Sequence, residues 1–242
     1  MRTGRIPRFH VAAGLQAGAQ LELPREAAHH AARVLRLRIG DAVTLFDGTG
    51  GEYEAKVAAL PRGGVAVAIG AHLPRERESP LAVTLVQGIA GADRMDFIIQ
   101  KAVELGVAAI HPVLTSKSVV RLSKERGEAR VAHWQRIVIA ACEQCGRNRI
   151  PEVSPAEPLA QYSPPQAGAK VMLSPGADKD LKQVAQGPLV LAVGPEAGFD
   201  AAEEKLLAQK GFVPARLGPR VLRTETAALA ALAALNALRG DF

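Results

Sequence analysis

The sequence predicts an α/β protein with a mostly parallel sheet, preceded by a small unit of β-strands with one helix. From Leu81 onward, short apolar runs alternate with stretches whose apolar residues recur every three or four positions. This alternation of strands and helices is typical of a parallel sheet covered by helices. Before Leu81, apolar and polar residues mostly alternate between glycine turns, which is typical of paired short strands.

The boundary between the two patterns predicts two domains. Residues 73–80, "LPRERESP", are charged and contain two prolines, which is typical of a linker. We therefore predict an N-terminal domain over residues 1–72 and a C-terminal domain over residues 81–242. In the first domain, residues 24–37 predict a helix that opens with Pro24, and residues 40–73 predict a curled meander of strands.

The elements of the C-terminal domain follow in regular order. Asp200 and Glu203 are spaced as a capping box at the start of one helix, and Gly106 is a suitable end for another. The apolar runs predict strands at 81–89, 107–114, 169–175, 187–194 and 213–218. The helical periodicity predicts helices at 93–106, 128–144, 200–211 and 225–238.

Composition narrows the classes of protein. The chain has 242 residues, of which 48% are hydrophobic, so it can bury a large core. Its most apolar helix is shorter than the roughly 20 residues of a membrane span, and the N-terminus lacks the apolar stretch of a signal peptide. We expect a soluble, cytoplasmic protein without a membrane partner. The formal net charge is +6, concentrated in the N-terminal third, which is compatible with an RNA partner or simply with a soluble surface.

The two cysteines form the motif Cys-Glu-Gln-Cys at residues 142–145. They fall near the end of a predicted helix, where the helix dipole does not activate a thiol. No second pair of Cys or His residues has the spacing of a zinc site. We therefore interpret them as ordinary thiols and expect no metal.

Three loops rich in Gly and Pro follow strands of the C-terminal domain. They are "LSPGA" at 173–177, "GPEAGF" at 194–199 and "LGPRVLRTETA" at 217–227. Ligands bind at the carboxyl ends of parallel strands, so the three loops predict one shared pocket, although each alone could be a tight turn. The glycine motifs that bind nucleotide phosphates are absent, which argues against a nucleotide-dependent oxidoreductase.

The motifs "VGPEAGFDAAE" and "LGPRVLRTETAA" resemble the paired signature of the SPOUT methyltransferases. Together with "RIPRFHV", "HHAARVLRLRIGD", "LFDGTG", "QKAVELGVAAIHPV" and "EQCGRNRIPEV", they are similar in order to the bacterial small-subunit (16S) ribosomal RNA uridine-N3 methyltransferase family, RsmE. This resemblance implies a PUA-like RNA-binding barrel and a catalytic domain with a deep trefoil knot. It also implies a homodimer that binds S-adenosylmethionine (SAM) and methylates N3 of a specific uridine in the assembled small subunit.

The resemblance also implies the residues that hold the cofactor. Ala197 departs from the family, which usually has Gly there, and we expect this position to need a small side chain rather than a positive φ. The predicted cofactor-binding residues are Leu173, Ser174, Gly194, Pro195, Glu196, Ala197, Gly198, Leu217, Gly218, Val221, Leu222, Arg223, Glu225, Thr226 and Ala227. We further expect side chains among Thr224, Glu225 and Thr226 to cap the amides that open the last helix.

Catalysis requires removal of the uridine N3 proton or stabilisation of the resulting anion. The predicted catalytic residues are Arg147, Arg223 and Glu143, although Glu143 and Arg147 are also spaced for an ordinary salt bridge. The predicted RNA-binding residues are Arg8, His30, Arg33, Arg36, Gln144 and Asn148. Two alternatives stay open: a SPOUT enzyme for another ribosomal or transfer RNA nucleotide, and a non-catalytic RNA-binding assembly factor.

Overall fold

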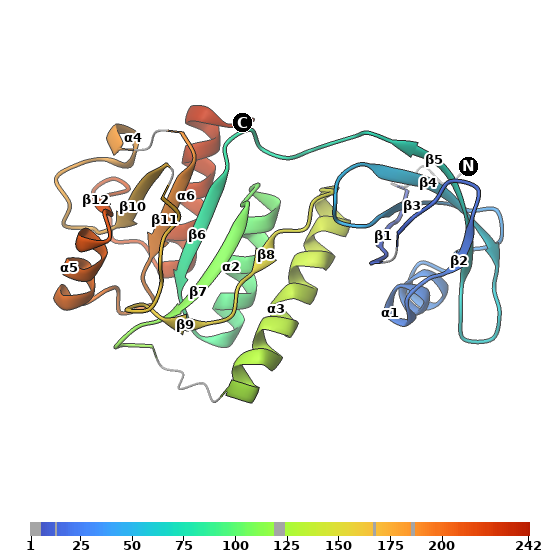
Figure 1. Ribbon diagram of the computed structural model, residues 1–242, viewed down its shortest axis with the longest axis horizontal. Coiled ribbons are helices and arrows are strands. Elements are labelled where there is room, and N and C mark those ends of the chain that lie inside the picture. The colour runs from blue at the N-terminus through green and yellow to red at the C-terminus, as the bar shows by residue number, and fades with distance from the viewer. Residues whose placement is uncertain (1–5, 13, 119–123, 167, 185–186) are drawn as a thin grey trace. The chain divides into compact units, whose positions relative to one another are not determined.

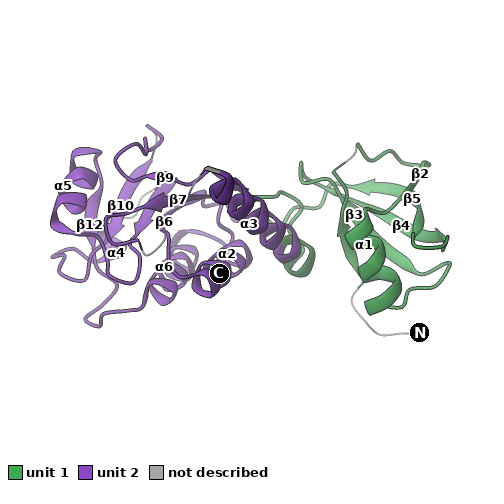
Figure 2. Cartoon of the chain, turned by 90° about the horizontal axis from the view of Figure 1, so that it is seen from below, with its two compact units in different colours: residues 1–78, 142–150 green, residues 79–141, 151–242 purple. Residues whose placement is uncertain are grey.

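The computed structural model describes residues 6–12, 14–118, 124–166, 168–184 and 187–242 (Figure 1). The chain divides into two compact units, coloured separately in Figure 2. The N-terminal unit comprises Met1–Glu78 together with Cys142–Ile150, and the C-terminal unit comprises Ser79–Ala141 with Pro151–Phe242. The N-terminal unit is therefore built from two separate segments of the chain.

The N-terminal unit contains a five-stranded sheet with the order β1-β3-β4-β5-β2. Strands β1 and β3 pair in parallel and the other neighbours are antiparallel. The β4–β5 pairing has two register irregularities, a feature that typically bends a strand. The strands are β1 (Arg8–His10), β2 (Gln20–Glu22), β3 (Ala42–Phe46), β4 (Glu52–Ala59) and β5 (Ala66–Leu73).

One helical segment packs on this sheet. It begins as α1 (Arg25–His29) after Pro24 and continues as one π-helical turn, η1 (His30–Val34). Ala28 and Ala31 face the buried cluster of the sheet. The prediction of a regular helix as far as residue 37 was wrong at its end, because Arg36 adopts a positive φ of 53°, which terminates the helical backbone.

The C-terminal unit is built on a seven-stranded sheet with the order β12-β10-β11-β6-β7-β8, and β9 also pairs with β7. The pairings among the described strands of this sheet are all parallel, so the predicted fold class is confirmed. The strands are β6 (Val83–Gly88), β7 (Ala109–Leu114), β8 (Glu152–Val153), β9 (Glu157–Pro158), β10 (Ala169–Leu173), β11 (Leu189–Val193) and β12 (Val213–Ala215). The short strands β8 and β9 had no signal in the hydrophobic pattern.

Helices cover both faces of this sheet. Leu207 of α5 (Ala201–Gln209) packs with Val86, Val190 and Ala192 on one face. Since side chains alternate along a strand, Val83, Leu85 and Gln87 point to the other face, where α2 (Ala92–Glu104) and α6 (Thr224–Arg239) pack together. The remaining helices are α3 (Lys124–Cys145) and α4 (Leu181–Val184). No helix in the described part of the chain is long and apolar enough to cross a membrane.

Candidate functional site

A cavity of about 320 Å³ lies where β10, β11 and β12 end, and the three loops predicted to form one pocket line it together. All of the predicted cofactor-binding residues line this cavity except Arg223, Glu225 and Thr226. The lining also includes residues that were not among the predicted cofactor-binding residues: Pro175, Val193, Phe199, Glu204, Ala215, Arg216, Arg220 and Thr224.

The loop at 194–199 is tightly packed against its surroundings. A Cβ on Gly88, at the end of β6, would lie 2.5 Å from Cδ of Pro195, so only glycine permits this approach. Gly198 has a φ of 67°, whereas Arg36 is the only non-glycine residue with positive φ among those described. Ala197 therefore takes no left-handed strain, as we expected, and Gly198 supplies the turn.

Glu196 ties this loop to the start of α2. Its Oε1 accepts hydrogen bonds from the backbone N–H of Gly91 at 2.9 Å and from Nη1 of Arg94 at 2.6 Å. Burial alone would raise the pKa of Glu196, but these hydrogen bonds and the Arg94 charge outweigh it and lower the pKa. Glu196 is thus held as a carboxylate at the cavity wall.

The first turn of α6 reaches the same loop through Thr224. The Thr224 hydroxyl donates to the Gly194 carbonyl at 2.6 Å and accepts from Nε2 of Gln87 at 3.0 Å. The N-cap of α6 is Arg223, without a side-chain capping bond. The expectation that Thr224, Glu225 or Thr226 caps this helix was therefore wrong, because the Thr224 hydroxyl is used by the neighbouring loop instead.

The predicted capping box at α5 is confirmed. The Asp200 side chain accepts from the Glu203 N–H at 2.8 Å, and the Glu203 side chain accepts from the Asp200 N–H at 3.0 Å. The loop after β7 joins this box, since Ser116 donates its hydroxyl to Asp200 and its N–H to Glu203. The hydrogen bond from Ser116 is the main cause of the lowered pKa of Asp200.

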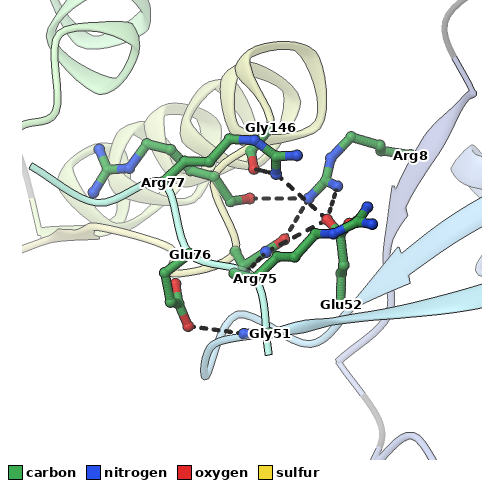
Figure 3. Close-up of polar contacts among 9 residues, drawn as sticks. Arg8, Gly51, Glu52, Arg75, Glu76, Arg77 and Gly146 are labelled. Atoms are coloured by element: carbon green, nitrogen blue, oxygen red, sulfur yellow. Dashed lines mark hydrogen bonds and ion pairs between the residues drawn. The ribbon is translucent and has the colours of Figure 1, made fainter. Parts of the chain in front are cut away.

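A second polar group lies in the N-terminal unit, and we call it the arginine cluster: Arg8, Glu52, Arg75, Arg77, Glu78, Arg147 and Asn148. The guanidinium of Arg8 pairs with Glu52 (Figure 3). It also donates to the side-chain oxygen of Asn148. The Nη1 atoms of Arg75 and Arg77 also pair with the Glu52 carboxylate, at 3.2 Å from Oε1 and 3.4 Å from Oε2. Burial would raise the pKa of Glu52, but hydrogen bonds and charges from these arginines outweigh it and lower the pKa.

Two predicted catalytic residues lie in or beside this cluster. Arg147 is 4% exposed, and its guanidinium pairs with the Glu78 carboxylate. Glu143 accepts a hydrogen bond from the His10 N–H at 2.9 Å. Burial raises the pKa of Glu143, while the His10 hydrogen bond and the Arg8 charge act in the opposite direction. Both residues belong to the N-terminal unit, whereas Arg223 is exposed beside the cavity loop at 217–222.

The predicted RNA-binding residues fall into two groups. His30, Arg33 and Arg36 are exposed on or just after η1, and Gln144 is exposed on the last turn of α3. Arg8 and Asn148, by contrast, are buried within the arginine cluster. The first group is available to a macromolecular partner in this structure, and the second is occupied by protein contacts.

The cysteines are both free. Cys142 is buried, and burial raises the pKa of its thiol to about 12. Such a thiol is not a nucleophile at neutral pH.

Gln87 and Arg94 are site residues that the sequence analysis missed, and Thr224 was expected only as a helix cap. The sequence did contain a signal for Gln87, since it is a polar residue on the same strand face as the apolar residues Val83 and Leu85. Arg94 reads as an ordinary charged residue in the first turn of a helix, and only its contact with Glu196 connects it to the cavity.

Comparisons with known proteins agree with this architecture. A family model described as RNA methyltransferase domain matches residues 77–236, and one described as RNA methyltransferase PUA domain matches residues 23–70. The ribosomal RNA small subunit methyltransferase E of Buchnera aphidicola subsp. Schizaphis graminum is 33% identical over 98% of this chain and 98% of its own length.

Two solved structures are similar over almost the whole chain. The ribosomal RNA small subunit methyltransferase E of Neisseria gonorrhoeae, bound to S-adenosyl methionine, is 40% identical, covers 98% of this chain and 100% of its own, and superposes with a TM-score of 0.91. A putative methyltransferase from Legionella pneumophila, in complex with SAM, is also 40% identical. It covers 99% of this chain and 100% of its own, and has a TM-score of 0.93. These matches confirm the resemblance drawn from the motifs: the chain belongs to the ribosomal RNA small subunit methyltransferase E family.

Proposed function

We propose that this protein is a SAM-dependent methyltransferase that modifies N3 of a specific uridine in the 16S ribosomal RNA of the small ribosomal subunit. The observation that carries the proposal is the cavity at the ends of β10, β11 and β12, which the three family loops line together. Relatives of nearly the same length are named ribosomal RNA small subunit methyltransferase E, and two solved relatives hold SAM.

The lining of the cavity fits this cofactor. Leu173, Val221 and Leu222 provide apolar surface, and the glycine-rich loop at 194–199 brings backbone groups close to a ligand. Glu196 adds a carboxylate at the wall, which suits a cationic ligand. When bound, SAM supplies a methyl group on a positively charged sulfur. Transfer of this methyl group to N3 would form a carbon–nitrogen bond and break the carbon–sulfur bond, which would leave the sulfur as an uncharged thioether and release the N3 proton to water.

Among the predicted catalytic residues, we favour Arg223 for the chemical step. Its chain neighbours Leu222 and Thr224 both line the cavity, and its side chain is exposed beside them. A guanidinium at this position would stabilise negative charge on the uracil carbonyl oxygens as the N3 proton leaves. We propose that Arg147 and Arg8 instead hold the N-terminal unit together, because their guanidinium groups are buried against Glu78 and Glu52.

We propose that the N-terminal unit captures the RNA through the exposed residues His30, Arg33 and Arg36, because the guanidinium groups of the two arginines suit phosphate contacts. The family resemblance further supports a cytoplasmic homodimer and a trefoil knot formed by the C-terminal segment.

The test is incubation of the purified protein with methyl-labelled SAM and small ribosomal subunits that lack the modification, followed by nucleoside mass spectrometry. The proposal expects 3-methyluridine that is absent without protein, and an Arg223→Ala variant that binds SAM but turns over at least about 100-fold more slowly. Methylation of a different nucleoside would contradict the assigned target. Failure of the wild-type chain to bind SAM would favour a non-catalytic assembly factor.

A further inference from the structure

Gln87 lies at the end of β6 with no exposed surface. It belongs to none of the three loops that line the cavity. Strand β6 lies between β11 and β7 in the sheet, so Gln87 is close to the centre of the C-terminal unit. A fully buried glutamine requires an explanation, because each polar atom that is removed from water needs a partner.

The side-chain nitrogen of Gln87 joins three separate segments of the chain. Its Nε2 donates to the Gly88 carbonyl at 2.9 Å and to the Thr224 hydroxyl at 3.0 Å, and it lies 3.4 Å from the Gly194 carbonyl. Because carbonyl oxygens only accept hydrogen bonds, the amide nitrogen has to be the atom on this side. The Thr224 hydroxyl then donates to Gly194, which completes a chain of hydrogen bonds from β6 through α6 to the 194–199 loop.

The other polar atom of the same side chain is unsatisfied. The Oε1 atom of Gln87 is buried and has no hydrogen-bond partner in the described part of the chain. A buried acceptor without a donor costs free energy, and a methionine of similar size would avoid that cost. The position thus retains a donor at the expense of stability, which is a feature of functional sites more than of cores.

The hydrogen-bonded partners of Gln87 are themselves part of the cavity wall. Gly194 and Thr224 line the cavity, and Pro195 packs directly on Gly88, the neighbour of Gln87. We propose that Gln87, acting through Thr224, is a positioning residue that sets the spacing between two of the cavity loops and thereby the affinity for the cofactor. This inference rests on the proposed function, since it takes SAM as the ligand.

The test measures SAM affinity by isothermal titration calorimetry and stability by thermal unfolding, in full-length variants. Gln87→Met and Thr224→Val each remove one link of the chain, and we expect each to weaken SAM binding about tenfold, as the loss of one well-placed hydrogen bond does. Thr224→Ser keeps the hydroxyl and should bind SAM within about twofold of wild type. The double variant should be little worse than either single one, because the two residues act as one unit.

Stability separates positioning from a merely structural role. Gln87→Met should melt within about 4 °C of wild type, because the unsatisfied oxygen is removed together with the donor. The matched control is Asn236→Ala, at the other end of α6. Asn236 is 2% exposed and bonds to Ser79 and to the Leu105 carbonyl, so its loss should lower the melting temperature and leave SAM affinity unchanged.

If the wild-type chain binds SAM and the Gln87→Met variant binds it with the same affinity, the inference is overturned while the proposed function stands. A loss of affinity that simply follows the melting temperature through all variants, Asn236→Ala included, would also overturn it. A wild-type chain that binds no SAM would contradict the proposed function, and the inference would fall with it.

Discussion

The Nε atom of Arg147 lies 3.1 and 3.0 Å from the two carboxylate oxygens of Glu78, within the N-terminal unit. The side chains are 5% and 22% exposed, so this is a largely buried ion pair. Removing one partner of such a pair leaves the other charge without compensation, which is more costly than removing both. The pair therefore predicts that substitution of Arg147 affects folding first.

We expect Arg147→Ala to lower the free energy of unfolding by about 3 kcal/mol. The affinity for SAM should stay within about threefold of wild type, because every residue that lines the cavity belongs to the C-terminal unit. Urea unfolding and calorimetric titration check the two expectations. Arg136→Ala is the matched control, since Arg136 is an exposed arginine of α3, the helix that ends two residues before Arg147. Unchanged stability with complete loss of methyl transfer would instead identify Arg147 as catalytic.

The lowered pKa of Glu52 predicts a dependence of stability on pH. A carboxyl whose pKa is lower in the folded chain stabilises it above its unfolded pKa of 4.5, and this contribution is lost as the pH falls through the folded value. We therefore expect Glu52→Gln to melt well below wild type at pH 7 and the difference to shrink steadily below pH 4.5. Thermal unfolding across that range measures it, and a difference independent of pH would contradict the assignment.

The backbone at Ala197 and Gly198 predicts different effects of two substitutions, one harmless and one destabilising. Ala197→Gly should change SAM affinity by less than about tenfold, because no left-handed strain is relieved. Gly198→Ala forces a side chain into a φ of 67° and should cost about 1 kcal/mol or more of stability. Titration calorimetry and thermal unfolding of both variants are the measurements. A larger gain in affinity from Ala197→Gly would show that position 197 itself needs glycine.

The Arg94–Glu196 pair predicts that loss of the Arg94 charge weakens SAM binding slightly and that the loss depends on salt concentration. The side chains are 47% and 32% exposed, so the ion pair itself is weak. We expect Arg94→Met to weaken SAM binding by about two- to fivefold at low salt and by less at 1 M salt, where such pairs are screened. Lys205→Met, on an exposed lysine of α5, controls for the change in net charge. Equal losses in both variants would exclude a specific role of the pair.

The two thiols should differ in reactivity. The pKa of about 12 for buried Cys142 predicts slow alkylation, while Cys145 is partly exposed. Iodoacetamide at pH 8 should therefore label Cys145 first in the folded protein, and both residues after denaturation. Peptide mass spectrometry gives the sites. Rapid labelling of Cys142 in the folded chain would mean that the α3 terminus opens readily.

The sequence predicted the parallel sheet and the cavity loops because both depend on local patterns. The strand at 81–89 and the helix at 93–106 follow from the spacing of apolar residues, and the loops follow strands whose carboxyl ends meet at one edge of the sheet. The family resemblance then added roles that spacing alone does not provide. Gly198 shows the limit, because only the backbone angle distinguishes its role from that of its neighbour.

The arginine cluster could not be predicted, because its partners are far apart in sequence. Arg8 and Glu52 are 44 positions apart, and Arg147 and Glu78 are 69 apart. Arginine and glutamate side chains are exposed in most proteins, so the residue types alone predict a surface position for each of these four residues. Spacing along the chain indicates only local partners. It suggested a salt bridge between Glu143 and Arg147, whereas the structure pairs Arg147 with Glu78 on a distant segment.

The N-terminal unit includes Cys142–Ile150, and this has a consequence for how the protein is made. On the ribosome, the first 78 residues emerge without Arg147 and Asn148, which later pair with Glu78 and Arg8. Co-translational folding of this unit therefore cannot finish until residue 150 has left the exit tunnel, by which time β6, α2 and β7 have already been synthesised. A fragment that stops at residue 78 would leave Glu78 without its arginine, whereas a fusion that joins the two segments directly would restore it.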